Sequence, residues 1–136
     1  MPNLTLHVTP QDGDLLNVDQ SGNGNQIAHG QSITITWHLD VPDHQGSFNA
    51  ISDDPDTSGF TWIQAPNPAI FTDLQRTGNA NKKIKITDNN NDPNGINSTG
   101  DWIYQLRATI GTHQYSTTTT LSNPRVVTTN PTIKNK

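Results

Sequence analysis

The chain has 136 residues, no cysteine, and a net charge of −4 from eight basic and twelve acidic residues. The length indicates a single domain. Nucleic-acid binding needs a broad positive surface, so the charge argues against a nucleic-acid partner, and the lack of cysteine excludes disulfides, thiolate metal sites and a cysteine nucleophile.

All twelve acidic residues are Asp. Asp prefers caps and turns, so we expect little or no helix. No apolar run reaches the roughly 18 residues of a membrane span. The first five residues have neither the basic start nor the apolar core of a signal peptide. The composition, rich in Asn and Thr and poor in Lys, favours a secreted or cell-surface location.

Alternation of apolar and polar residues predicts a first strand through Leu4, Leu6 and Val8, which ends at Pro10. The same period of two, or a short apolar run between turn residues, predicts further strands. These lie at residues 15–18, 27, 32–40, 48–51, 60–63, 69–71 and 83–87. The segments between them carry the Asn, Asp, Gly and Pro residues of turns.

The longest alternating stretch is residues 100–110, and it predicts the central strand of the sheet. One face carries its large apolar residues, with Gly111-Thr112 as a tight hairpin turn to residues 113–117. This pattern and those of the earlier strands predict a buried set of six residues: Ile35, Trp37, Ile84, Tyr104, Leu106 and Ala108.

The chain is expected to divide into residues 1–122, a β-sandwich, and residues 123–136, a C-terminal segment rich in Thr, Asn and Pro. Pro124 and Pro131 cannot donate ladder hydrogen bonds, which disfavours a central strand. Val126, Val127 and Ile133 are apolar anchors. We therefore expect the segment to pack on its own sandwich or on a neighbouring subunit.

Seven or eight short strands with regular turn signals predict an all-β chain folded as an antiparallel β-sandwich. Residues 100–106, GDWIYQL, resemble the sixth strand of an immunoglobulin-like domain, with Leu106 standing where an antibody domain has Cys. The Tyr-Ser-Thr-Thr strand and the Asn-Pro-Thr-Ile-Lys-Asn ending are similar to those of small bacterial immunoglobulin-like proteins. The resemblance implies that the Tyr104 hydroxyl bonds to backbone within residues 88–100, and it implies no activity.

Oxygen-bearing side chains repeat at every second residue in Asp88, Asn90 and Asp92. This spacing is typical of calcium loops. Asp101 is the nearest later carboxylate, so the predicted ligand set is Asp88, Asn90, Asp92 and Asp101. Pro93 stands where an EF-hand needs Gly, and no Glu closes the loop. Turns capped by Asp and Asn side chains explain the same residues without an ion.

Two other clusters also have two interpretations each. His38, Asp40, Asp43 and His44 flank one turn and have the residue types of a zinc site, or they form a polar surface turn. An acidic loop contains Asp53, Asp54 and Asp56. It is either a solvated turn or binds a cation together with the Asp88 loop.

No Gly-x-Ser-x-Gly motif occurs, and every Asp lies in or beside a predicted turn. We therefore expect no enzyme activity. The expected function is a structural or protein-interaction module, with self-association through an edge strand or the terminal segment as one form. The alternative is a module that binds calcium or carbohydrate, because Trp62 and Trp102 have the aromatic faces on which sugar rings stack. Filling the core is the competing role of these two residues.

Overall fold

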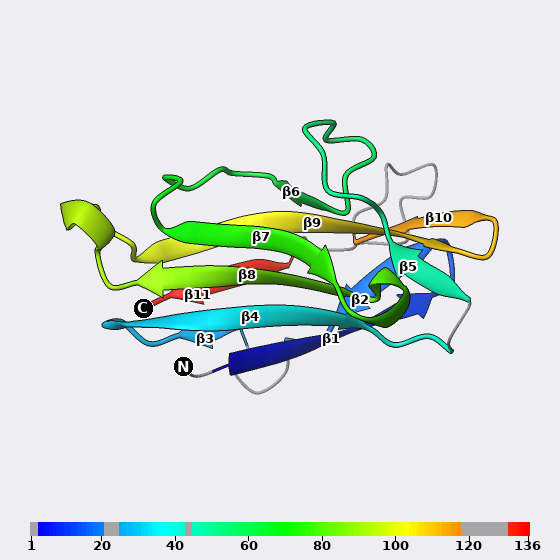
Figure 1. Cartoon of the computed structure of the whole chain (residues 1–136), viewed down its shortest axis with the longest axis horizontal. Helices are drawn as coiled ribbons and strands as arrows, with labels where there is room; N and C mark the ends of the chain where they lie inside the picture. Colours follow the sequence, from blue (N-terminus) through cyan, green and yellow to red (C-terminus); the bar gives the residue numbers. More distant parts are fainter. Residues whose placement is uncertain (1–2, 21–24, 43–44, 118–130) are drawn as a thin grey trace.

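The computed structural model describes residues 3–20, 25–42, 45–117 and 131–136 of the chain. These residues form eleven strands and two short 3₁₀ turns, η2 (Asn79–Asn81) and η3 (Pro93–Gly95) (Figure 1). The strands are β1 (Asn3–Gln11), β2 (Leu15–Val18), β3 (Gln26–Ile27), β4 (Gln31–Leu39), β5 (Gly46–Phe48), β6 (Phe60–Trp62), β7 (Phe71–Thr77), β8 (Lys83–Asn90), β9 (Gly100–Ile110), β10 (His113–Ser116) and β11 (Thr132–Asn135). Within the described ranges, none of the helical segments is long and apolar enough to span a membrane.

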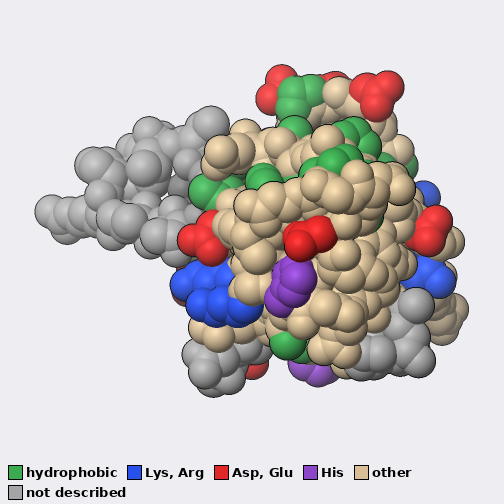
Figure 2. Space-filling view, turned by 90° about the vertical axis from the view of Figure 1, so that its left-hand side faces the viewer, with side chains coloured by type: hydrophobic (Ala, Val, Ile, Leu, Met, Phe, Trp, Pro, Cys, Tyr) green, Lys and Arg blue, Asp and Glu red, His purple; other side chains and the backbone are tan. Residues whose placement is uncertain are grey.

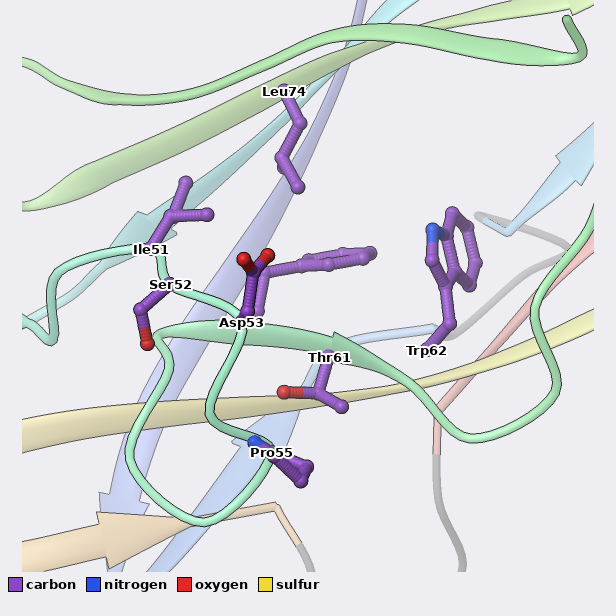
Figure 3. A pocket seen from close by; sticks show the side chains of 8 residues that line it. Ile51, Ser52, Asp53, Pro55, Thr61, Trp62 and Leu74 are labelled. Carbon is purple, nitrogen blue, oxygen red and sulfur yellow. The ribbon is translucent and has the colours of Figure 1, made fainter. Parts of the chain in front are cut away.

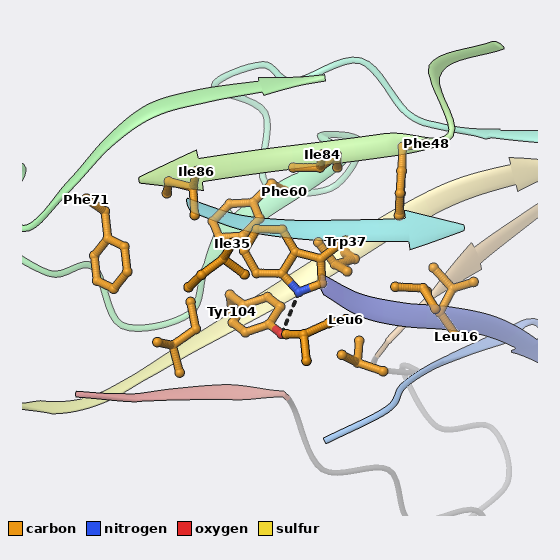
Figure 4. Packing of buried hydrophobic residues seen from close by; sticks show 14 of the residues in the cluster. Leu6, Leu16, Ile35, Trp37, Phe48, Phe60, Phe71, Ile84, Ile86 and Tyr104 are labelled. Carbon is orange, nitrogen blue, oxygen red and sulfur yellow. Dashed lines mark hydrogen bonds between the residues drawn. The ribbon is translucent and has the colours of Figure 1, made fainter. Parts of the chain in front are cut away.

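One continuous hydrogen-bonded path joins the strands in the order β3-β11-β9-β10-β2-β1-β4-β8-β7, and β5 and β6 both pair with β9. The path folds over on itself, because side chains of β4 and β9, which are not paired strands, pack against each other across the core (Figure 4). One layer is β7-β8-β4-β1, and the other is built around β9.

Strand β1 connects the two layers. Its residues 3–8 pair in parallel with residues 34–39 of β4, while residues 8–11 pair antiparallel with β2. β2 in turn meets β10 in the other layer. A parallel pair needs a long crossover between its strands, and β2 and β3 lie in that crossover.

Strand β9 has the most pairing partners and confirms the prediction of a central strand. β10 and β11 pair with its two ends along one edge, and β5 and β6 pair along the other. The predicted hairpin from β9 to β10 is also confirmed. Its turn begins at Gly111, whose φ of 62° is a conformation that side chains disfavour.

The hydrophobic core lies between the two layers (Figure 4). All six residues predicted to form it are 0% exposed: Ile35, Trp37, Ile84, Tyr104, Leu106 and Ala108. Trp37 is tilted against Phe60 and Tyr104 with ring centroids 5.3 and 5.0 Å apart. Large aromatic rings therefore supply the centre of this core.

The predicted partner of the Tyr104 hydroxyl is wrong. The hydroxyl oxygen accepts a hydrogen bond from the Trp37 indole nitrogen at 2.8 Å (Figure 4), and not one from backbone within residues 88–100. Tyr104 points across the core toward β4, where the indole N–H of Trp37 lies.

The expectation of an all-β chain is confirmed, but purely antiparallel pairing is wrong. The pairs β1 with β4, β2 with β10, and β3 with β11 are parallel. The number of described strands also exceeds the predicted seven or eight. Residues 123–130 of the predicted C-terminal segment lie outside the described residues, and residues 132–135 form β11 between β3 and β9.

Candidate binding site

A pocket of about 260 Å³ opens beside β6 (Figure 3). β6 supplies Phe60, Thr61 and Trp62, and β7 supplies Leu74. The loop between β5 and β6 supplies the other lining residues: Ile51, Ser52, Asp53 and Pro55. β6 pairs only with β9 and β7 only with β8 among the described strands. The pocket therefore lies where the outermost strands of the two layers face each other.

The aromatic wall of the pocket is fixed by packing. Trp62 stands edge-on to Phe60 at a centroid distance of 4.9 Å and is tilted against Phe71 at 4.7 Å. Phe60 is stacked on Tyr104 with an interplanar angle of 7°. Trp62 is half-buried, so it keeps part of its surface for a ligand while its orientation is set by buried neighbours.

The loop that forms the opposite wall is held by its own hydrogen bonds. The Asp54 carboxylate accepts from the Asp56 backbone N–H at 2.9 Å, and the Ser52 N–H donates to the Ser58 hydroxyl at 3.0 Å. The Arg107 guanidinium donates to the Pro55 carbonyl. Gly59 is needed at the base of the loop, because a Cβ there would lie 2.1 Å from the Asn49 carbonyl oxygen. The loop is thus ordered without a ligand.

The acidic loop of the sequence therefore has two kinds of carboxylate. Asp54 caps the turn, whereas Asp53 lines the pocket with its carboxylate directed inward (Figure 3). Sequence reasoning named Asp53 and Trp62 in separate contexts, and the structure brings them to one site. It did not assign Ile51 or Leu74 to a site, and the strand predicted at residues 69–71 ended before Leu74 of β7.

The four predicted calcium ligands have different environments. Asp88 and Asn90 are 0% exposed on the core-facing side of β8, while Asp92 and Asp101 are exposed. Ser98 links two of them, since its hydroxyl lies 2.8 Å from Asn90 Oδ1 and 3.1 Å from Asp92 Oδ1. The described hydrogen bonds do not join Asp101 to this group. Calcium binding stays a prediction.

Asp88 is a buried carboxyl group with one identified partner. Its Oδ1 accepts from the Asn135 amide of β11 at 3.0 Å. Its Oδ2 and the Asn135 Oδ1 are buried without a hydrogen-bond partner among the described residues. Burial raises the pKa of Asp88 from 3.8 to about 7, against the opposing effect of the Asn135 hydrogen bond. Asp88 therefore keeps its proton to a higher pH than an exposed Asp does.

Asp92 behaves in the opposite way. The backbone N–H of Ser98 donates to its carboxylate, and His29 lies 3.2 Å from the other oxygen, so the pKa of Asp92 is lowered. It has a left-handed φ of 48° before Pro93. These contacts are those of a capped turn.

The predicted zinc cluster is brought together in part. His38 Nδ1 lies 3.1 Å from Asp40 Oδ1, and Asp43 and His44 lie outside the described residues. His7 of β1 also belongs to the cluster. It was not among the residues predicted from the sequence. Only the parallel register, which pairs His7 with His38, brings it there.

No protein-family model matches the sequence, and neither does any curated protein.

Proposed function

We propose that this chain is a non-enzymatic binding module of immunoglobulin-like type, which binds an extended segment of a partner protein on the side between β6 and β7. The observation that carries the proposal is the pocket formed by Trp62, Leu74 and the preformed β5–β6 loop. It lies between two strands whose outer edges have no partner strand in the described part of the chain.

The arrangement of the strands supports the immunoglobulin-like type. In an immunoglobulin constant domain, strands A, B, E and D form one sheet and C, F and G the other. β1, β4, β8 and β7 correspond to the first set, and β5 with β6, β9 and β10 to the second. The parallel pairing of β1 with β4 departs from that pattern and is a variation at one edge.

Strand addition is the mode of binding that this side of the molecule favours. An open strand edge offers unpaired backbone groups, and a neighbouring pocket selects one side chain of the added strand. β7 is a poor acceptor, because Asp73 has a φ of 60° and the register shifts between Thr72 and Gln75. β6 is therefore the edge to which we assign the partner.

The chemistry of the lining defines the partner segment. Ile51, Trp62 and Leu74 suit an apolar side chain. The Asp53 carboxylate at the pocket favours a Lys or Arg in the partner segment, next to the apolar side chain that enters the pocket. Figure 2 shows acidic side chains at the height of the β5–β6 loop, above hydrophobic side chains on the same face. The expected motif is an apolar anchor next to Lys or Arg.

Carbohydrate is the second candidate ligand, and one observation favours it. A fixed, half-exposed Trp62 ring and the Asp53 carboxylate lie in the same pocket. A sugar can stack its apolar face on an indole while its hydroxyls donate to a carboxylate.

Selection of peptides from a random display library, with parallel screening of an oligosaccharide array, tests both ligands. Trp62→Ala should weaken binding of the selected peptide at least tenfold. Trp102→Ala is the matched control, since Trp102 is also half-buried but does not line the pocket. Backbone NMR shifts should map to β6 and the β5–β6 loop. Binding that survives Trp62→Ala, or that maps elsewhere, contradicts the proposed site.

A further inference from the structure

We propose that His7, His38 and Asp40 bind one divalent transition-metal ion of the zinc type, across the parallel pair of β1 and β4. Their ligand atoms all lie within 4.8 Å of one another. The site is separate from the pocket at β6 and does not depend on the proposed function.

The backbone places the three side chains on one outward face. His7 and His38 are register partners in the parallel ladder, so both side chains leave the same side of the sheet. Asp40 follows the end of β4, and its N–H donates to the Val8 carbonyl at 2.8 Å. The carboxylate is thereby held beside both imidazoles by hydrogen-bonded backbone.

The distances match a metal coordination sphere. Asp40 Oδ2 lies 3.0 Å from His7 Nδ1, and Asp40 Oδ1 lies 3.1 Å from His38 Nδ1. Zinc bonds of about 2.0–2.1 Å in a tetrahedron put neighbouring ligand atoms about 3.3 Å apart. The two rings are edge to face with centroids 5.8 Å apart, so both imidazoles lie beside the same carboxylate.

The ligand types select the ion. Two imidazoles and one carboxylate suit Zn²⁺, Ni²⁺ or Cu²⁺, whereas Ca²⁺ and Mg²⁺ require mainly oxygen ligands. Three protein ligands leave the fourth position to water. Binding requires that Nδ1 of each imidazole gives up its proton. Lys83 is the register partner of His38 on β8, and Asp40 supplies the negative charge of the proposed site.

Calorimetric titration of the whole chain with zinc chloride tests the site, with calcium and magnesium chloride as comparisons. We expect one equivalent of Zn²⁺ to bind. His7→Gln, His38→Gln and Asp40→Asn should each weaken this binding at least tenfold, and the exposed positions leave the fold intact. Calcium and magnesium should give no heat of binding at these residues.

The chain offers two matched controls. His29 beside Asp92 and His113 beside Asp14 are exposed pairs of one imidazole and one carboxylate, and they lack the second imidazole. His29→Gln and His113→Gln should leave the zinc affinity within twofold. Imidazole NMR signals of His7 and His38 should shift with zinc, while those of His29 and His113 stay. Absence of zinc binding at millimolar concentration, or equal affinity in His38→Gln and His113→Gln, overturns the proposal.

Discussion

Trp37 on β4 donates its indole N–H to the hydroxyl of Tyr104 on β9 at 2.8 Å, and both residues are 0% exposed. The bond joins the two layers at the centre of the core. Neither group has access to water, so each depends on the other for its polar contact.

Tyr104→Phe should lower the free energy of unfolding by about 1–3 kcal/mol, because it leaves the buried Trp37 N–H without an acceptor. Urea denaturation measures this. Tyr115→Phe is the control, since Tyr115 is only partly buried at the edge of the core. In the double variant with Trp37→Phe, the loss should be less than additive. A wild-type midpoint for Tyr104→Phe contradicts the assigned bond.

Leu106→Ala should lower the free energy of unfolding by about 2–5 kcal/mol, the range for truncation of a buried leucine. Leu106 is 0% exposed on the strand that pairs with four others. Ile63→Ala is a matched control, because Ile63 is 50% exposed and should change stability little. A small loss at Leu106 would mean that β9 is shifted by one residue, which inverts its faces.

Asp88 should make the protein less stable as the pH rises from about 4 to 7. Its pKa is raised from 3.8 to about 7, so in this range the folded chain holds a proton that the unfolded chain has lost. The free energy of unfolding then falls by up to about 1.4 kcal/mol per pH unit from this group and levels off above pH 7. Denaturation at a series of pH values measures the slope.

Asp88→Asn isolates this contribution, since the amide is neutral at every pH and close to the carboxyl group in size. The slope between pH 4 and 7 should decrease, and the variant should exceed wild type in stability at pH 8. Asp101→Asn, at an exposed position, should keep the wild-type slope. An unchanged slope in Asp88→Asn means that the carboxyl is ionised and solvated.

Millimolar calcium should leave the unfolding temperature unchanged. Asp88 and Asn90 face the core, while Asp92 and Asp101 are exposed, so the four side chains are divided between the core and the solvent. Thermal unfolding with and without calcium checks this. A rise in melting temperature that Asp92→Asn removes would support the calcium prediction, since a ligand that binds the folded state must stabilise it.

The core could be predicted from sequence because most of its large side chains follow the strand period of two, as Trp102, Tyr104, Leu106 and Ala108 do. Asp88 and Asn90 continue the inward row of Ile84 and Ile86. They were nevertheless predicted to lie in a loop, because Asp and Asn usually form turns. Their burial depends on Asn135 and Ser98, which no local pattern connects to them.

The other features that sequence reasoning missed also depend on distant pairing. β7 was predicted only as a brief edge segment because the left-handed Asp73 interrupts its alternation. His7 reaches His38 through the parallel register of β1 with β4, and the strand pattern is the same for either direction of pairing. The binding pocket combines residues from a loop and two strands, so its lining has no sequence period.

The position of β11 has a consequence for folding during synthesis. This strand enters between β3 and β9, and the Asn25 amide donates to the Thr132 carbonyl, 107 residues further along the chain. Such long-range closure is slow, because the entropy of the intervening chain is lost before the contact forms. A nascent chain that has not yet produced residues 132–135 leaves the Gly100–Ile103 edge of β9 unpaired. That interval is when a neighbouring nascent chain can pair there and start aggregation.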